Sequence, residues 1–333
     1  MALKRISLVA VLLVLAGGSL FAQDEKPDLA KLWETGSLWE VGDNRAVVKD
    51  ARQQIIDSGE EGLKFALTKL DAADTLHIRC LRGVFNGFED NPDLKGKAFD
   101  GLVANIANED ATARRNVAEL LASMDDQRAA EHLLAQAKVE DSMGARLAQL
   151  AALSKWKNED AIPLLVELSS NEMDRIRHRV TGLLGAYETR NAVFRLIEML
   201  DDNVYYVRDG ARDALAKGTP AARTVCLARL TTQLALPGES QSLQHIRLLL
   251  PIVASLANDD VPVILQKALK HSSGLVRGDA AEALVTWKLG AGLLDAKLDV
   301  KALLDTAIDN EHDPYAKSVM ESARKKLEDT DKK

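Results

Sequence analysis

The chain has 333 residues and a formal net charge of −7 at pH 7. This acidic balance excludes a general nucleic-acid-binding function, which needs a basic surface, and it argues against adhesion to anionic membranes. Alanine and leucine dominate, only 4% of the residues are aromatic, and the apolar–polar alternation of strands is rare, so the composition favours helices.

The N-terminal residues have the pattern of a secretory signal peptide. Lys4 and Arg5 precede an apolar run over residues 6–16, and small residues lead to Ala22. We expect cleavage after Ala22, which makes residues 1–22 a signal peptide and the protein exported, either periplasmic or secreted. An uncleaved N-terminal anchor is the alternative, because the apolar run is close in length to a membrane span. No later segment reaches that length, so we expect no membrane association after cleavage.

Residues 23–59 are predicted to form an N-terminal helical cap. They contain Trp33 and Trp39, followed by a helical stretch from Arg45 to Ile56. An uncapped helical stack would expose a large apolar surface, so we expect the tryptophans to cover the open end of the first repeat. An aromatic docking site is the alternative function for these two side chains.

A repeated pattern occupies most of the remaining chain. In its four clearest copies an Arg follows a Leu by 12 residues, and apolar residues follow the Arg at +3 and +7. This spacing marks one face of a helix, and the polar residues before it suit a turn that caps this helix. Each copy therefore predicts two helices joined by a turn. The Leu–Arg pairs are Leu102 and Arg114, Leu165 and Arg177, Leu196 and Arg208, and Leu265 and Arg277.

Weaker copies place Arg79, Arg146, Arg247 and Lys317 at the marker position. Successive markers lie 30 to 40 residues apart, which is typical of an array of helical hairpins. We therefore predict an all-α solenoid of about eight hairpins over residues 60–328, followed by a charged tail at residues 329–333. The segment 243–256 is apolar nearly all round, so it is either buried or part of a contact surface.

The segment from Asp202 to Leu215 resembles the HEAT repeats, in particular the short repeats of phycobilisome-lyase-like HEAT proteins. It contains the turn Asp, the pair Val207 and Arg208, and the Ala and Leu that follow. The resemblance implies a right-handed α–α superhelix of the HEAT/armadillo type. It also implies a structural role for the turn Asp and for the marker arginines, which are Arg114, Arg146, Arg177, Arg208, Arg247 and Arg277.

The residues that could carry chemistry lack a catalytic or metal-binding pattern. The six histidines form no HExxH pair, and no haem-attachment, nucleophile-elbow or Walker motif occurs. We therefore expect no metal, no cofactor and no catalysis. Cys80 and Cys226 lie in apolar helical patterns several repeats apart, so we interpret both as buried free thiols and not as a disulfide.

One cluster is a candidate binding site. Arg175, His178 and Arg179 form a basic group on one predicted helix, and Tyr205 and Tyr206 follow in the next repeat. Adjacent tyrosines cannot both point inward, and exposed aromatics beside arginines are typical of interaction hot spots. The alternative is that the arginines belong only to the structural ladder of the repeats.

Stacked hairpins form a long concave surface, which suits an extended protein or peptide partner. We expect the second helix of each hairpin to line this surface. The sequence therefore predicts an exported scaffold that binds a protein or peptide on its curved surface, without catalysis. One alternative is a lyase or chaperone-like enzyme that acts on a protein or chromophore, by analogy with the bilin lyases. Another is a purely structural role in an envelope complex.

Overall fold

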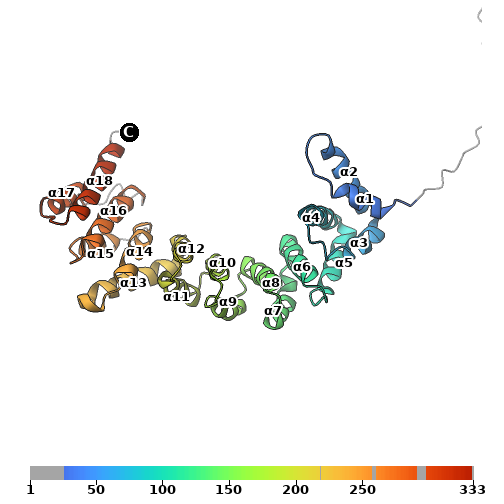
Figure 1. Cartoon of the computed structure of the whole chain (residues 1–333), viewed down its shortest axis with the longest axis horizontal. Helices are drawn as coiled ribbons and strands as arrows, with labels where there is room; N and C mark the ends of the chain where they lie inside the picture. Colours follow the sequence, from blue (N-terminus) through green and yellow to red (C-terminus); the bar gives the residue numbers. More distant parts are fainter. Residues whose placement is uncertain (1–25, 218, 257–259, 291–297, 332–333) are drawn as a thin grey trace, which may run out of the picture.

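The structure, a computed structural model, describes residues 26–217, 219–256, 260–290 and 298–331 (Figure 1). Within these ranges the regular elements are helices, and no strand occurs. None of the helices described is both long and apolar enough to cross a membrane. The predicted signal peptide at residues 1–22 lies outside the described residues.

The helices pair into hairpins, as the repeat pattern predicts. Two cap helices, α1 (Leu29–Gly36) and α2 (Asn44–Asp57), come first, and eight hairpins follow in the described part of the chain. The first helices of these hairpins are α3 (Gly59–Leu67), α5 (Pro92–Val103), α7 (Ala130–Val139), α9 (Ile162–Leu168), α11 (Arg190–Glu198), α13 (Pro220–Ala235), α15 (Val261–Ala268) and α17 (Val300–Asp309). The second helices are α4 (Thr75–Asp90), α6 (Ala111–Met124), α8 (Met143–Lys155), α10 (Asp174–Leu184), α12 (Tyr205–Ala216), α14 (Leu243–Ala254), α16 (Gly274–Gly290) and α18 (Pro314–Asp331). The predicted all-α solenoid is confirmed.

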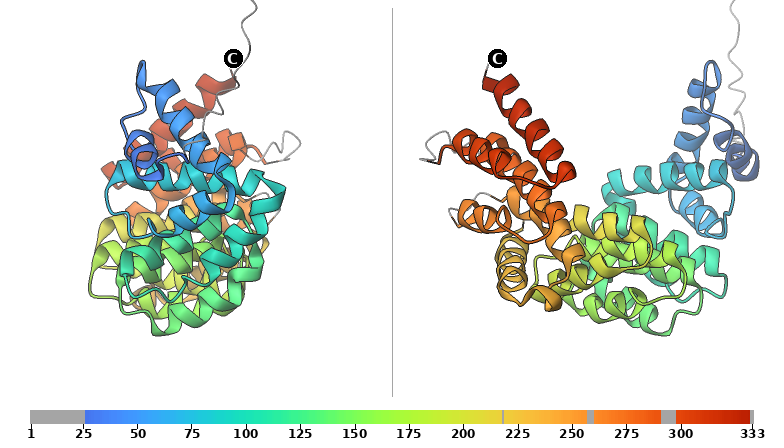
Figure 2. Two further views of the ribbon diagram at one scale, coloured as in Figure 1. Left: turned by 90° about the vertical axis from the view of Figure 1, so that its right-hand side faces the viewer. Right: turned by 60° about the vertical axis from the view of Figure 1, so that its left-hand side comes forward.

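The hairpins stack side by side into an open U (Figure 1). The second helices lie on the inner side of the U, and the first helices lie on the outer side. The cap helices and the last hairpin form two arms that rise on either side of the middle repeats (Figure 2). The inner surface is therefore built from α4, α6, α8, α10, α12, α14, α16 and α18.

The apolar positions of the repeat form the core. Val207, Ala211 and Leu215 lie on one face of α12 and are at most 1% exposed. Equivalent side chains of the other hairpins join them in one continuous apolar core along the solenoid. Cys80 and Cys226 are buried free thiols, as predicted. Burial raises the pKa of the Cys226 thiol to about 12, so this side chain behaves as a small apolar residue.

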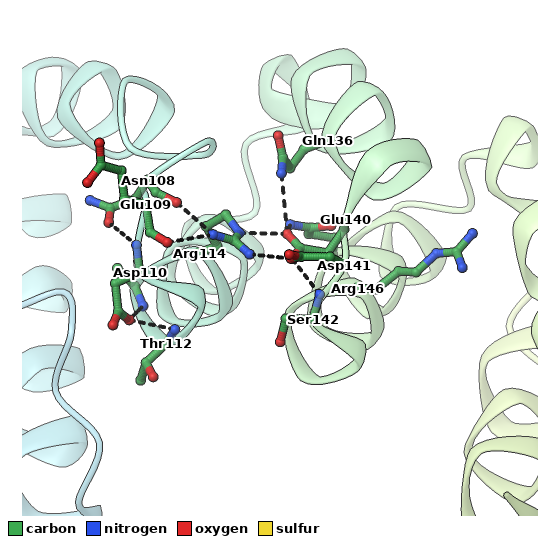
Figure 3. Close-up of polar contacts among 12 residues, drawn as sticks. Asn108, Glu109, Asp110, Thr112, Arg114, Gln136, Glu140, Asp141, Ser142 and Arg146 are labelled. Atoms are coloured by element: carbon green, nitrogen blue, oxygen red, sulfur yellow. Dashed lines mark hydrogen bonds and ion pairs between the residues drawn. The ribbon is translucent and has the colours of Figure 1, made fainter.

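A buried arginine joins the second and third hairpins (Figure 3). Arg114, the fourth residue of α6, donates from Nη1 to the backbone carbonyls of Asn108 and Glu109, at 2.8 and 3.0 Å. Its Nε and Nη2 donate to the two carboxylate oxygens of Glu140 in the next turn, at 2.8 and 2.7 Å. One side chain therefore holds its own turn closed and binds the turn of the following hairpin. We call this contact an arginine bridge.

Two further arginine bridges repeat this geometry. Arg177 binds Asp202 at 2.7 and 2.9 Å, and Arg277 binds Glu311 at 2.6 Å through both nitrogens. In all three bridges the Arg is the fourth residue of a second helix. The carboxylate lies three residues before the next second helix begins. This pairing of positions links each of these hairpins to the next hairpin along the chain.

At three other junctions the carboxylate position holds a residue that cannot form the bridge. These residues are Asn171, Ser240 and His271. The arginines that precede them, Arg146, Arg208 and Arg247, make other contacts. The marker arginines thus divide into two groups with different surroundings, which the sequence pattern did not separate.

The N-terminal cap buries only one of its two tryptophans. Trp33 is 3% exposed and packs against Phe65, with its ring stacked on His77. Trp39 is 52% exposed, with the Arg79 guanidinium over its ring at 5.1 Å. Trp33 therefore packs on the first repeat as expected, whereas the Trp39 ring contacts this repeat through Arg79 and leaves half of its surface exposed, so the expectation of a covered Trp39 is only partly met. Its alternative role as a docking residue remains a prediction.

The C-terminal end also differs in detail from the sequence prediction. Helix α18 continues to Asp331, so residues 329–331 of the predicted charged tail are helical. A charged segment can continue a helix that begins against the core, because its polar residues need no burial.

Replacement of Arg114 by Ala should lower the free energy of unfolding by about 3–5 kcal/mol, because it leaves the buried Glu140 carboxylate without its cation. Replacement of Arg208, at the same repeat position but without a carboxylate partner, should cost less than about 1 kcal/mol. Urea titration followed by circular dichroism measures both losses. Equal losses in the two variants would refute the structural role assigned to the bridge.

The bridges also predict how stability depends on pH. Burial opposes ionisation of Glu140, but the hydrogen bonds from Arg114, the Ser142 N–H and Gln149 outweigh it, so its pKa falls from 4.5 to about 2. Arg277 likewise lowers the pKa of Glu311 to about 2. A lowered pKa in the folded state stabilises the fold above the unfolded pKa, and this stability is lost as the pH falls from about 5 to about 2.

The expected slope over that interval is at most about 1.4 kcal/mol per pH unit for each carboxylate. The double variant Glu140→Gln and Glu311→Gln should be less stable at pH 7 and should have a flatter stability profile between pH 5 and pH 2. Urea titrations at a series of pH values test this. An unchanged slope in the double variant would show that these two carboxylates do not set the acid sensitivity.

Candidate functional site

A groove lies on the inner surface between α10 and α12. Its volume is ≈ 420 Å³, and it is open to solvent along one side. Arg175, His178, Arg179, Thr181 and Gly182 line it from α10, and Gly210, Asp213, Ala214 and Lys217 line it from α12 and the residue after it. Three of the five predicted binding residues, Arg175, His178 and Arg179, therefore lie in one depression.

Two glycines shape the floor of this groove. A Cβ at Gly210 would lie 2.5 Å from Thr181 Oγ1, so the absence of a side chain there allows α10 and α12 to approach each other. A Cβ at Gly182 would meet no atom within 4 Å, because this residue faces the open groove. The groove therefore has a shallow, uncovered floor between two closely packed helices.

The arginine cluster of α10 divides between two roles. Arg177 forms the arginine bridge to Asp202, with only 13% of its side chain exposed. Arg175 and Arg179 lie one helical turn apart on the groove side and are exposed. Within the described residues neither of these two makes an ion pair. The structure thus separates the structural Arg from two cations that are open to solvent.

An aromatic row begins at the edge of the groove. The Tyr206 ring packs edge-on against His178, with ring centroids 5.4 Å apart, and Tyr205 packs edge-on against Tyr206 at 5.5 Å. Asp174 accepts a hydrogen bond from the Tyr206 hydroxyl, which raises the pKa of Tyr206 and lowers that of Asp174. Tyr206 is half-buried, whereas Tyr205 is 67% exposed. Tyr205 is therefore the tyrosine of the pair that can be replaced with little effect on packing.

The groove includes residues that no sequence pattern singles out. Asp213 and Lys217 come from α12 and the position after it, and they face α10 across the groove. Their sequence neighbourhood resembles any solvated helix face, so only the stacking of the two helices reveals them. Lys217 adds a third cation, and Asp213 is paired with Arg212 at 3.1 Å. The groove therefore has an excess of positive charge within an acidic protein.

Two marker arginines contact their neighbours differently from Arg114. Arg146 donates to the Ala137 carbonyl at 3.1 Å and to Glu167 at the end of α9, at 3.2 and 3.4 Å. Arg247 is the fifth residue of α14 and donates to Asp279 of α16, at 2.5 and 3.5 Å. Arg247 therefore lies one position beyond the bridge position, and its side chain follows the inner surface.

In the part of the chain that the structure describes, no group of three or more His, Cys, Asp or Glu side chains is placed to hold a metal ion. The groove between α10 and α12 gathers cations and the His178 ring, and the two tyrosine rings lie at its edge. Such a combination can bind an anionic or aromatic group of a partner through charge-assisted hydrogen bonds and stacking.

Comparison with known families identifies the repeat. Residues 142–216 match the family model of the HEAT repeats. The matched segment runs from the start of α8 to the end of α12, so it contains both walls of the groove. No curated protein matches the sequence.

The chain is also similar to solved structures of helical-repeat proteins, and importin beta supports the fold. The chain is similar to importin beta with a TM-score of 0.53 at 12% identity, over 89% of this chain and 46% of the importin chain. The similarity to Escherichia coli YibA has a TM-score of 0.45 at 14% identity, over 79% of this chain and 97% of that one. The CpcE–CpcF complex of phycocyanin lyase from Nostoc sp. PCC7120 gives 0.39 at 18% identity, over 74% and 94%. At these identities the likeness concerns the fold alone.

Proposed function

We propose that this chain, a solenoid of HEAT repeats, is an exported scaffold that binds a protein or peptide partner on the inner surface of its U. The observation that carries the proposal is the groove between α10 and α12. There, Arg175 and Arg179 are exposed without ion pairs among the described residues, and the exposed ring of Tyr205 ends the aromatic row that starts at His178. These side chains are not needed to hold the hairpins together, since Arg177 forms the bridge.

The chemistry of the groove favours protein recognition. Arginine and tyrosine are enriched among residues that dominate binding energies, because they combine apolar contact with hydrogen bonding. An acidic side chain of a partner would complement the groove, and the excess of cations would orient the partner as it approaches. The walls are two rigid helices held by the core, so the binding groups are positioned before the partner arrives. We propose a binding role without catalysis on these grounds.

Export is part of the same proposal. It is supported by the order of Lys4, Arg5, the apolar run at residues 6–16 and the small residues before Ala22. N-terminal sequencing of the protein recovered from its native cells should give Gln23 as the first residue. Recovery of the chain with Met1 in the cytosolic fraction would contradict export.

The binding role can be tested with two kinds of variant. The triple variant Arg175→Ala, Arg179→Ala and Tyr205→Ala removes the free cations and the exposed ring. Gly182→Trp fills the groove, since a Cβ at this position meets no atom within 4 Å. Both should reduce recovery of the partner from cell-envelope extract at least about tenfold, which corresponds to about 1.4 kcal/mol. Quantitative mass spectrometry of the captured proteins is the measurement.

A matched control is Arg229→Ala, which removes an exposed cation from α13 on the outer side of the U. The control should capture the partner as well as the native chain does, and all variants should keep the native circular dichroism spectrum. If the native chain enriches no protein over the bare support, or if the groove variants enrich the same proteins equally, the proposed function is wrong.

A further inference from the structure

A second groove follows α14 on the inner surface, between α12 and α16. Its volume is ≈ 530 Å³. Arg208 and Arg212 of α12 form one wall, the exposed side of α14 forms the floor, and Asp279 and Glu282 of α16 form the other wall. The groove lies beside the one between α10 and α12, because α12 contributes to both. It therefore extends the proposed binding surface by two helices.

Arg208 occupies the bridge position but has no carboxylate to bind. It is the fourth residue of α12, as Arg114 is of α6, and Nη1 donates to the Asp202 carbonyl at 2.7 Å. The residue three positions before α14 is Ser240, where the bridged junctions have Glu or Asp. Among the described residues no carboxylate forms an ion pair with Arg208. One carbonyl accepts a hydrogen bond from its guanidinium. The Asp202 carboxylate, which Arg177 binds, is near enough for the charge of Arg208 to contribute to its lowered pKa, and Arg208 can still donate to a further acceptor.

The other two arginines of this groove already have partners. Arg212 pairs with Asp209 at 2.9 Å and with Asp213 at 3.1 Å. Arg247 pairs with Asp279 across the groove. Among the arginines that line this groove, Arg208 is therefore the one without a carboxylate at ion-pair distance within the described residues, and it lies at the end of the groove nearest the turns. A ligand carboxylate there would restore the interaction that Glu140, Asp202 and Glu311 provide elsewhere.

Between these charged side chains the groove also carries apolar ones. Leu243 of α14 is 40% exposed and Leu275 of α16 is 41% exposed. Leu248 of α14 also lines the groove and is half-buried. Pro251, about one turn later on the same face of α14, is exposed. Segment 243–256 is thus not wholly buried, since one face of α14 is buried in the core and the other lines the groove, and its role as a contact surface stays a prediction. A ligand that covers these side chains must itself carry apolar groups.

We propose that this groove binds an acidic, apolar peptide segment of the partner, with a carboxylate of the peptide on Arg208 and its apolar side chains on Leu243, Leu248 and Leu275. The inference deepens the proposed function and rests on it. The apolar floor favours a peptide over a sugar chain. Asp279 and Glu282 on the opposite wall repel ligands that carry several phosphate or sulfate groups. A single ligand carboxylate bound to Arg208 would instead lie against the wall that carries the two arginines of α12.

The test uses a fluorescein-labelled peptide of Leu, Ala and Ser residues with a single Glu, and the same peptide with Gln in place of that Glu. Fluorescence anisotropy with the full mature chain should show binding of the Glu peptide at least about tenfold tighter than binding of the Gln peptide. Arg208→Ala should remove most of this difference. Arg208→Lys should restore it only in part, because an ammonium cannot make the paired contact of a guanidinium. Arg229→Ala should bind as the native chain does.

Several outcomes would overturn the proposal. The first is a Kd of the native chain for the Glu peptide that is weaker than about 1 mM. The second is equal affinity of the native chain and the Arg208→Ala variant for this peptide. The third is displacement of the labelled peptide by a sulfated glycan fragment at a lower concentration than unlabelled peptide requires. Failure here is distinguishable from failure of the proposed function. If Arg208→Ala captures the envelope partner normally while the groove variants of α10 do not, the scaffold role stands and this subsite is wrong.

Discussion

Two helices joined by a short turn cannot bury both of their apolar sides, and this constraint determines the architecture of the whole chain. Each hairpin hides its apolar faces against the hairpins before and after it, so the core is continuous along the solenoid. The arginine bridges add a polar link at the turns, where the guanidinium also donates to backbone carbonyls of the turn that precedes its own helix. Packing and bridging together place the second helices on one side, where they form the inner surface of the U.

The bridges explain why this surface is uneven in charge. Where Glu140, Asp202 or Glu311 is present, the preceding Arg is neutralised and partly or wholly buried. Where Ser240 takes that place, Arg208 is left on the inner surface without such a partner. The free cations Arg175 and Arg179 lie one hairpin earlier. A run of three second helices, α10, α12 and α14, therefore concentrates the groups that are available to a partner.

Local patterns in the sequence were sufficient for the fold, whereas contacts between hairpins were not. The Leu–Arg spacing and the apolar positions of helices such as α12 are periodic within about one repeat, so they predict the hairpins. The same pattern treats Arg114, Arg208 and Arg247 alike, although only Arg114 forms a bridge. That difference depends on whether the following turn supplies a carboxylate. It also depends on where the helix begins, because Arg247 is the fifth residue of α14 and not the fourth. Likewise, Asp213 and Lys217 join the predicted cluster only because α12 stacks on α10.

The central claim is that a partner binds on the inner side of the U, across α10 to α14. Site-specific photo-cross-linking tests it most directly, with a photoreactive amino acid placed at Gly182 on the inner side or at Arg229 on the outer side. The account predicts a covalent adduct with the partner from position 182 and none from position 229. An adduct from position 229 alone would contradict it.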